Sequence, residues 1–165
     1  MVLASRIERR MKTANSKIEN EKPKIEIHIC ETPDDTFDLG EKLGGGLRGG
    51  EVILLSGGLG AGKTLFTKGI LYALDYDARE VTSPSFTLVN LYRTEKRDVY
   101  HIDFWRLDNL EDVAAAVGLS EILEDETAIV IAEWSERLKE ITFLNKIVRV
   151  AIEGDGDDAR KVTIQ

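Results

Sequence analysis

The sequence predicts an α/β domain with a mostly parallel central sheet and antiparallel C-terminal strands, and three observations predict it. An apolar run at residues 51–56 leads through a glycine-rich turn into a helical pattern at residues 65–74. Two further strand patterns, at residues 98–103 and 128–132, are each bounded by a carboxylate. The last two apolar runs, residues 147–152 and 161–164, flank a turn rich in glycine and aspartate, which is typical of an antiparallel hairpin.

The other elements follow in chain order. Alternating isoleucines at residues 25–29 predict a first strand. Thr32 then has the character of a helix cap, with Pro33 in the first turn, and this helix should end in the three glycines of residues 44–46. A further helix is expected over residues 110–123, between the two strand patterns that carry carboxylates.

Composition and length favour one domain, residues 25–165, because 165 residues with 42% hydrophobic content make one core of ordinary size. The formal net charge is −8, but residues 1–24 carry +4 and the rest carries −12. We therefore expect residues 1–24 to form a basic, flexible extension. A body this acidic argues against a dedicated nucleic-acid surface, which needs clustered lysine and arginine.

Cysteine content and hydropathy indicate the setting of the chain. Cys30 is the only cysteine, so neither an intrachain disulfide nor a cysteine metal cluster is expected. The apolar run at residues 128–132 is far shorter than the roughly 18 residues of a membrane span. We expect a cytoplasmic protein that does not enter a membrane.

Residues 57–64, GGLGAGKT, match the phosphate-binding loop pattern G-x-x-x-x-G-K-[ST]. The match lies between a predicted strand and a predicted helix, which is the context that the pattern requires. In such a loop, backbone N–H groups surround the phosphates of ATP or GTP, and the helix N-terminus adds to the attraction. Lys63 would reach the β- and γ-phosphates, and the Thr64 hydroxyl would bind Mg²⁺. The motif predicts the three-layer P-loop NTPase fold.

Two acidic residues are the leading candidates to work beside this loop. Asp103 and Glu133 each lie at the carboxyl end of a predicted strand, where open α/β sheets carry their chemistry. Carboxylates there would hold the metal or orient the attacking water. The segment at residues 81–89 lies where a nucleotide-sensing loop could sit, although its local pattern favours a plain loop before an edge strand. Trp134 could cover the site or belong to the core.

Four blocks, GGLGAGKTLFTKGIL, VTSPSFTLVNLY, VYHIDFWRL and AIVIAEWSERL, occur in this order along the chain. Together they resemble the TsaE family, formerly YjeE, of small bacterial ATPases that support tRNA threonylcarbamoyladenosine synthesis. The resemblance runs from about Glu31 to the carboxyl end and omits only the basic extension. It implies ATP and Mg²⁺ as cofactors.

The resemblance also implies roles for individual residues. Catalytic positions would be Lys63, Asp103 and Glu133, and the Mg²⁺ positions would be Thr64 and Glu133. A conformationally responsive segment would run from Ser83 to Val89 and include Thr87, while Trp134 matches the tryptophan after the family's glutamate. Nucleotide contacts are implied at Leu59, Gly60, Ala61, Gly62, Lys63 and Thr64, and, from a looser match, at Pro33 and Gly156.

By this resemblance the chain would bind and hydrolyse ATP in concert with TsaB and TsaD. Those partners would modify the adenosine beside the anticodon in tRNAs that read codons beginning with A, and the chain would meet tRNA only through them. The sequence departs from the family pattern at Gly58, where an acidic residue is usual, and at Leu65, Ser85 and Trp105. None of these departures removes a predicted phosphate or metal ligand.

Other classes of protein also contain a phosphate-binding loop. A small-molecule or nucleotide kinase uses the same loop, metal threonine and strand-end acids, but normally adds an arginine-rich lid. A GTPase is disfavoured because residues 145–148 lack the aspartate of the guanine-reading N-K-x-D motif. A nucleotide-dependent binding module with slow hydrolysis is partly compatible with the leading interpretation.

Overall fold

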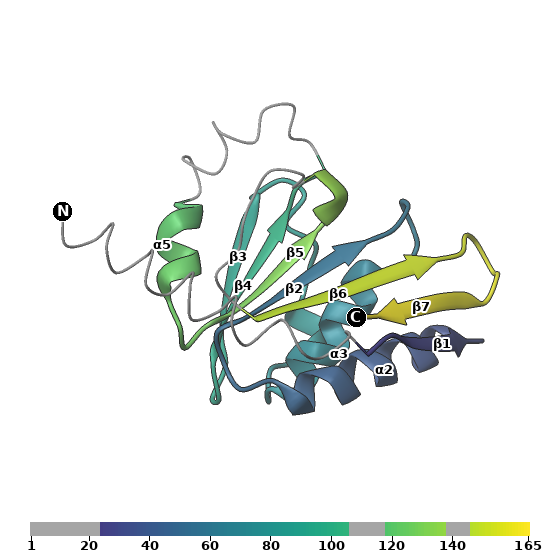
Figure 1. Cartoon of the computed structure of the whole chain (residues 1–165), viewed down its shortest axis with the longest axis horizontal. Coiled ribbons are helices and arrows are strands. Elements are labelled where there is room, and N and C mark those ends of the chain that lie inside the picture. Colours follow the sequence, from purple (N-terminus) through teal and green to yellow (C-terminus); the bar gives the residue numbers. More distant parts are fainter. Residues whose placement is uncertain (1–23, 106–117, 138–145) are drawn as a thin grey trace.

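A seven-stranded sheet forms the centre of the computed structural model, which describes residues 24–105, 118–137 and 146–165 (Figure 1). The strands lie in the order β1-β7-β6-β2-β5-β4-β3. Their bounds are β1 (Glu26–Cys30), β2 (Glu51–Ser56), β3 (Val89–Arg93), β4 (Asp98–Asp103), β5 (Ile129–Glu133), β6 (Lys146–Glu153) and β7 (Arg160–Ile164). All the strands predicted from the sequence are present.

The central strands are parallel and the outer ones are antiparallel. β6, β2, β5 and β4 run parallel to one another, whereas β6 with β7, β7 with β1 and β3 with β4 pair antiparallel. The predicted mostly parallel centre and the C-terminal hairpin are thus confirmed. The edge strand at β3 agrees with the local pattern after residues 81–89, but its antiparallel direction was not predicted. This direction follows from the short turn between β3 and β4, because a parallel pair would need a long crossover.

Helices cover both faces of the sheet, which makes the predicted three layers. One face is covered by α2 (Pro33–Gly46) and α3 (Lys63–Ala73), whose Leu39, Phe66 and Ile70 join its core. The other face packs against α5 (Leu119–Glu124). Short 3₁₀ turns lie at η1 (Ala78–Glu80) and η2 (Ser135–Arg137).

Two predictions fall wholly or partly outside the described residues. Of the helix expected at residues 110–123, only the part from residue 118 is described, and there α5 is found. The basic extension at residues 1–24 lies outside the described part except for Lys24, so its flexibility stays a prediction. Within the described ranges, no helix has the length and apolar character needed to cross a bilayer.

The start of α2 agrees with the cap predicted from the sequence. The Thr32 hydroxyl accepts a hydrogen bond from the Asp35 backbone N–H at 3.2 Å, and the Asp35 carboxylate accepts one from the Thr32 N–H at 2.8 Å. This reciprocal pair satisfies two helix-end donors and fixes where the helix begins. The helix ends at Gly46, inside the predicted run of glycines.

Close packing of α2 on α3 depends on Gly69, because a Cβ there would collide with the Phe37 carbonyl and lie 2.8 Å from the Glu41 backbone nitrogen. We expect Gly69→Ala to lower the free energy of unfolding by about 2 kcal/mol through overpacking. Urea unfolding measures this. Gly45→Ala is the matched control, since a Cβ at Gly45 meets nothing within 4 Å. It should raise stability by about 0.5–1 kcal/mol through helix propensity, and equal effects of the two changes would contradict the packing argument.

Candidate functional site

The glycine-rich loop joins the buried end of β2 to the first turn of α3. Gly62 forms the N-cap of α3 with φ of +107°, and no side chain caps this helix, so its first N–H groups point into the loop. Gly57 has φ of +143°, and a Cβ there would collide with the Ile152 carbonyl of β6. Glycine at these positions gives the loop a shape in which backbone N–H groups can surround an anion.

The side chain of Lys63 turns back into the glycine-rich loop that precedes it in the chain. It is 5% exposed, and its ammonium donates to the carbonyls of Gly57 and Gly58, both at 2.8 Å. The same ammonium lies 3.9 Å from the centroid of the Trp134 ring, a cation–π contact. Burial lowers the pKa of Lys63, and the charge of Glu133 opposes this shift. The cation is therefore held at the loop by neutral partners that a phosphate group can replace.

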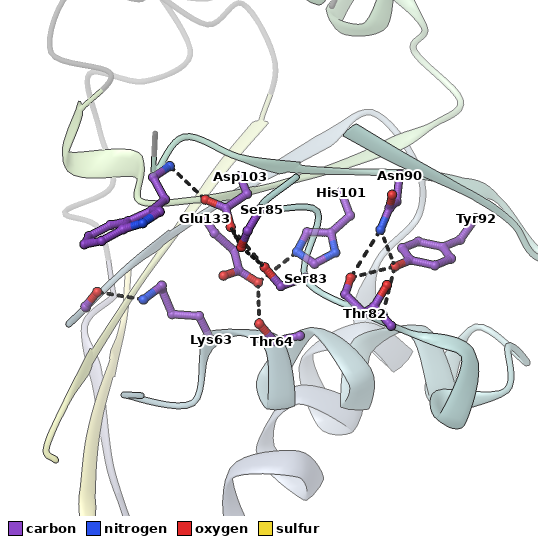
Figure 2. Close-up of polar contacts among 12 residues, drawn as sticks. Lys63, Thr64, Thr82, Ser83, Ser85, Asn90, Tyr92, His101, Asp103 and Glu133 are labelled. Atoms are coloured by element: carbon purple, nitrogen blue, oxygen red, sulfur yellow. Dashed lines mark hydrogen bonds and ion pairs between the residues drawn. The ribbon is translucent and has the colours of Figure 1, made fainter. Parts of the chain in front are cut away.

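Thr64 and Glu133 meet beside Lys63 (Figure 2). The Thr64 hydroxyl donates to Glu133 Oε1 at 3.0 Å. His101 Nε2 lies 2.8 Å from the same carboxylate oxygen, and His101 is fully buried on β4. We place the ring proton on Nε2, because the carboxylate is an acceptor and His101 Nδ1 is buried with no partner among the described residues. Hydrogen bonds from Thr64 and His101 therefore hold Oε1 of Glu133 in place.

Asp103 lies at the end of β4, the strand next to β5, and binds the segment that follows η1. Its Oδ2 accepts hydrogen bonds from the hydroxyls of Ser83 at 3.0 Å and Ser85 at 2.7 Å. Its Oδ1 accepts from the Trp105 N–H at 2.8 Å. Parallel pairing of β4 with β5 sets Asp103 opposite Glu133, which brings the two carboxylates to the same end of the sheet. The predicted responsive segment is therefore attached to a predicted catalytic residue.

A cleft of about 490 Å³ contains most of the residues predicted for the site. It is lined by Leu59, Gly60, Gly62, Lys63, Thr64, Ser83, Asp103, Glu133 and Trp134, among others. Trp134 has φ of +59°, a strained conformation for a large residue, and its ring covers Lys63. Thr87 is not part of this lining: it is exposed, and its hydroxyl donates to Asn90 Oδ1 at 2.8 Å.

A second hollow of about 300 Å³ adjoins the same loop and includes the two loosely matched residues. Pro33, Ala61 and Gly156 all line it. Arg160 of β7 joins its two sides, since its guanidinium donates to the Ala61 carbonyl at 3.0 Å and to the Gly156 carbonyl at 2.8 Å. The structure thus brings Pro33 and Gly156 to the phosphate-binding loop, while their contact with a nucleotide stays a prediction.

Comparison with known proteins identifies the family. The model of the family "Threonylcarbamoyl adenosine biosynthesis protein TsaE" matches residues 30–162. This chain belongs to the TsaE family. The resemblance drawn from the four sequence blocks is thereby confirmed, and it places this TsaE-family chain in tRNA threonylcarbamoyladenosine biosynthesis.

Individual TsaE relatives support the same assignment. The TsaE protein of Aquifex aeolicus is 38% identical over 137 residues, covering 82% of this chain and 92% of that protein. The TsaE protein of Mycobacterium leprae is 41% identical over 119 residues, covering 68% and 73%. Among solved structures, Bacillus subtilis YdiB superposes with a TM-score of 0.68 at 26% identity, covering 88% of this chain and 87% of that one. Fold and family therefore agree.

The donor set of this TsaE-family site suits Mg²⁺ with a bound nucleotide. Thr64 and Glu133, the two residues predicted to bind the metal, carry side-chain oxygens, and Mg²⁺ prefers oxygen over nitrogen or sulfur. Within the described ranges, no group of three or more histidine, cysteine or acidic side chains is arranged to hold a metal by itself. A Mg²⁺ ion that is also bound by phosphates and water needs only one or two protein oxygens. The site residues therefore fit the group that the family implies.

Three residues of the site were missed or given no role of their own from the sequence: His101, Ser85 and Arg160. His101 lies two residues before Asp103 on β4, so strand alternation places both side chains on one face, and this signal was available. Ser85 was included in the responsive segment and noted as a departure from the family pattern, but its hydrogen bond to Asp103 was not predicted. Arg160 had no local signal, because it reaches carbonyls about 100 positions away in the sequence.

His101 positions Glu133, and we expect His101→Leu to lower the turnover of ATP roughly tenfold while changing ATP affinity little. The change removes one of the two donors to Glu133 Oε1 and leaves Lys63 and the loop untouched. Steady-state kinetics together with nucleotide binding separate the two effects. His101→Gln keeps an N–H donor and should recover most of the turnover. Equal losses in both variants would show that His101 acts only through packing.

Proposed function

We propose that the protein is a Mg²⁺-dependent ATPase whose hydrolysis supports the TsaB–TsaD complex. The observation that carries this proposal is the meeting of Lys63, Thr64 and Glu133 in one cleft at the end of a phosphate-binding loop. Such a loop with a lysine, a hydroxyl and a strand-end carboxylate is the machinery that P-loop NTPases apply to the β- and γ-phosphates.

Each residue has a distinct task in this proposal. The N–H groups of residues 60–64 bind phosphate oxygens, and Lys63 turns from the carbonyls of Gly57 and Gly58 to the β- and γ-phosphates. Thr64 and Glu133 hold Mg²⁺, directly or through water. When bound there, the ion would supply positive charge that offsets the charge of the phosphates. Asp103 orients the water that attacks the γ-phosphate.

The segment from Ser83 to Val89 links the site to partners. Its serines bind Asp103, so a change at that carboxylate on ATP binding alters where the segment lies. We propose that ATP and Mg²⁺ order this segment into a surface for TsaB and TsaD, and that hydrolysis resets the assembly. The protein would act in the cytoplasm and meet tRNA only through the complex. The partners would then place the threonylcarbamoyl group on the adenosine beside the anticodon.

The test is ATP hydrolysis by the purified chain, alone and with TsaB and TsaD, with and without Mg²⁺. We expect little activity alone and clear stimulation by the two partners together. The product identifies the reaction class, since an ATPase releases inorganic phosphate and a kinase transfers it to an acceptor. Phosphorylation of a small metabolite by the chain alone, without stimulation by the partners, would favour the kinase instead.

A further inference from the structure

The edge strand β1 and the residue before it expose three isoleucines. Ile25 is 59% exposed, Ile27 is 61% exposed and Ile29 is 58% exposed. Alternation along the strand turns Glu26, His28 and Cys30 to the opposite face, the side of α2. We call Ile25, Ile27 and Ile29 the isoleucine face. Three neighbouring large apolar residues of this exposure are an unusual feature for a solvent-facing surface.

The outer edge of β1 is also open. β1 is the first strand in the sheet order and pairs with β7 on its inner side, and within the described residues no strand lies beyond it (Figure 1). Edge strands normally avoid pairing with other chains through proline, bulges or charged side chains. β1 has no proline or glycine, and its one acidic side chain, Glu26, lies on the side of α2, where it pairs with Lys24 at 2.7 Å. The edge is therefore suited to accept another strand.

We propose that β1 pairs antiparallel with β1 of a second copy of this chain, centred on Ile27. In this register Ile27 faces the partner's Ile27, and Ile25 faces the partner's Ile29. Glu26, which pairs with Lys24 of its own chain at 2.7 Å and lies 3.4 Å from its own His28, faces the partner's His28. A twofold axis repeats each contact, as an isologous interface requires. The sequence Ile-Glu-Ile-His-Ile at residues 25–29 is thus complementary to itself.

The neighbours of the isoleucine face favour a second copy over the chain's own basic N-terminal segment. The strand register places Lys161 and Glu153 beside Ile29, and those two side chains already form an ion pair at 3.0 Å. Thr163 and Ala151 lie beside Ile27. The surface is therefore mixed or neutral, and it offers no acidic patch for the net charge of +4 on residues 1–24. An apolar, self-complementary strand fits it better.

Pairing would join two seven-stranded sheets and bring six isoleucines together on one face. An edge-to-edge contact of this length is smaller than a standard protein interface, so we expect association to depend on concentration. The cleft of about 490 Å³ lies around β2, β5 and β4, at least three positions from β1 in the strand order, whereas the second hollow adjoins the carboxyl end of β1 at Cys30.

Sedimentation velocity of the full chain from about 1 to about 100 µM tests the proposal. We expect the mass to rise with concentration toward twice the 18.4 kDa of one chain. Ile27→Lys places two like charges at the twofold axis and should weaken association at least tenfold. Tyr72→Lys, at a 52% exposed position on α3, is the matched control and should leave association unchanged. Thermal unfolding checks that both variants are folded.

A charge exchange tests the register. Glu26→Lys and His28→Glu should each weaken self-association, whereas an equal mixture of the two should form heterodimers, because the new lysine of one variant then faces the new glutamate of the other. A chain that stays at 18.4 kDa throughout would overturn the proposal. An association that Ile27→Lys leaves intact, or a mixture that forms no heterodimer, would overturn the β1 interface and its register.

Discussion

Glu133→Gln is expected to lower the turnover of ATP roughly 100- to 1,000-fold, the usual cost of losing one group that stabilises charge in a transition state. The amide keeps the shape of the side chain, and its oxygen can still accept from Thr64 and His101, which lie 3.0 and 2.8 Å from Oε1. What is lost is the negative charge that would hold Mg²⁺. ATP affinity should therefore change by only a few fold.

The measurement is steady-state release of inorganic phosphate in the presence of the partners, across a series of Mg²⁺ concentrations. Glu136→Gln is the matched control, because Glu136 is an exposed carboxylate three residues further along and acts on Lys63 only through its charge. Its turnover should stay close to that of the wild type. Equal turnover in Glu133→Gln and the wild type would refute the role of Glu133.

Lys63→Ala is expected to weaken ATP binding roughly 100-fold, about 2.7 kcal/mol, because it removes the side-chain cation that lies in the cleft beside Thr64 and Glu133. The fold should persist, since burial disfavours the charged ammonium in the free protein and already lowers its pKa. Lys68→Ala is the matched control on the same helix, and Lys68 does not line the cleft.

Tryptophan fluorescence gives a direct measurement, because the Lys63 ammonium lies 3.9 Å from the Trp134 ring. ATP should draw the ammonium away from the ring and change the emission of the wild type. In Lys63→Ala the emission of the free protein should differ, and the ATP-dependent change should be lost at concentrations that saturate the wild type. Wild-type affinity in Lys63→Ala would contradict the assignment of this loop as the phosphate site.

The parts of the fold that sequence could predict are those encoded locally. The phosphate-binding loop, the cap at Thr32 and the strands that carry Asp103 and Glu133 each depend on residues close together in the chain. For the same reason the loop residues and the two carboxylates could be proposed as a site before the structure was known. The family resemblance favoured functional roles for Trp134 and the segment from Ser83 to Val89, which the local pattern had left open. The structure places Ser83 and Trp134, but not Thr87, in the cleft.

The remaining features depend on which strands are neighbours. His101 contacts Glu133 only because β4 lies beside β5 in a particular register, and alternation within β4 alone could not show this. The alternating isoleucines predicted the first strand correctly. They did not show that the isoleucines face solvent while the other side of the strand faces α2. That depends on the position of β1 at the edge of the sheet, with α2 on the opposite face.

The most direct test of the account is reconstituted tRNA modification with TsaB, TsaD and either the wild-type chain or Glu133→Gln. The readout is the amount of threonylcarbamoyladenosine formed per complex, determined by mass spectrometry of digested tRNA. We predict many modifications per complex with the wild type and, with Glu133→Gln, at most about one, because assembly would proceed and the hydrolytic reset would fail. Equal multiple turnover with both chains would contradict the claim that ATP hydrolysis at this site drives the cycle.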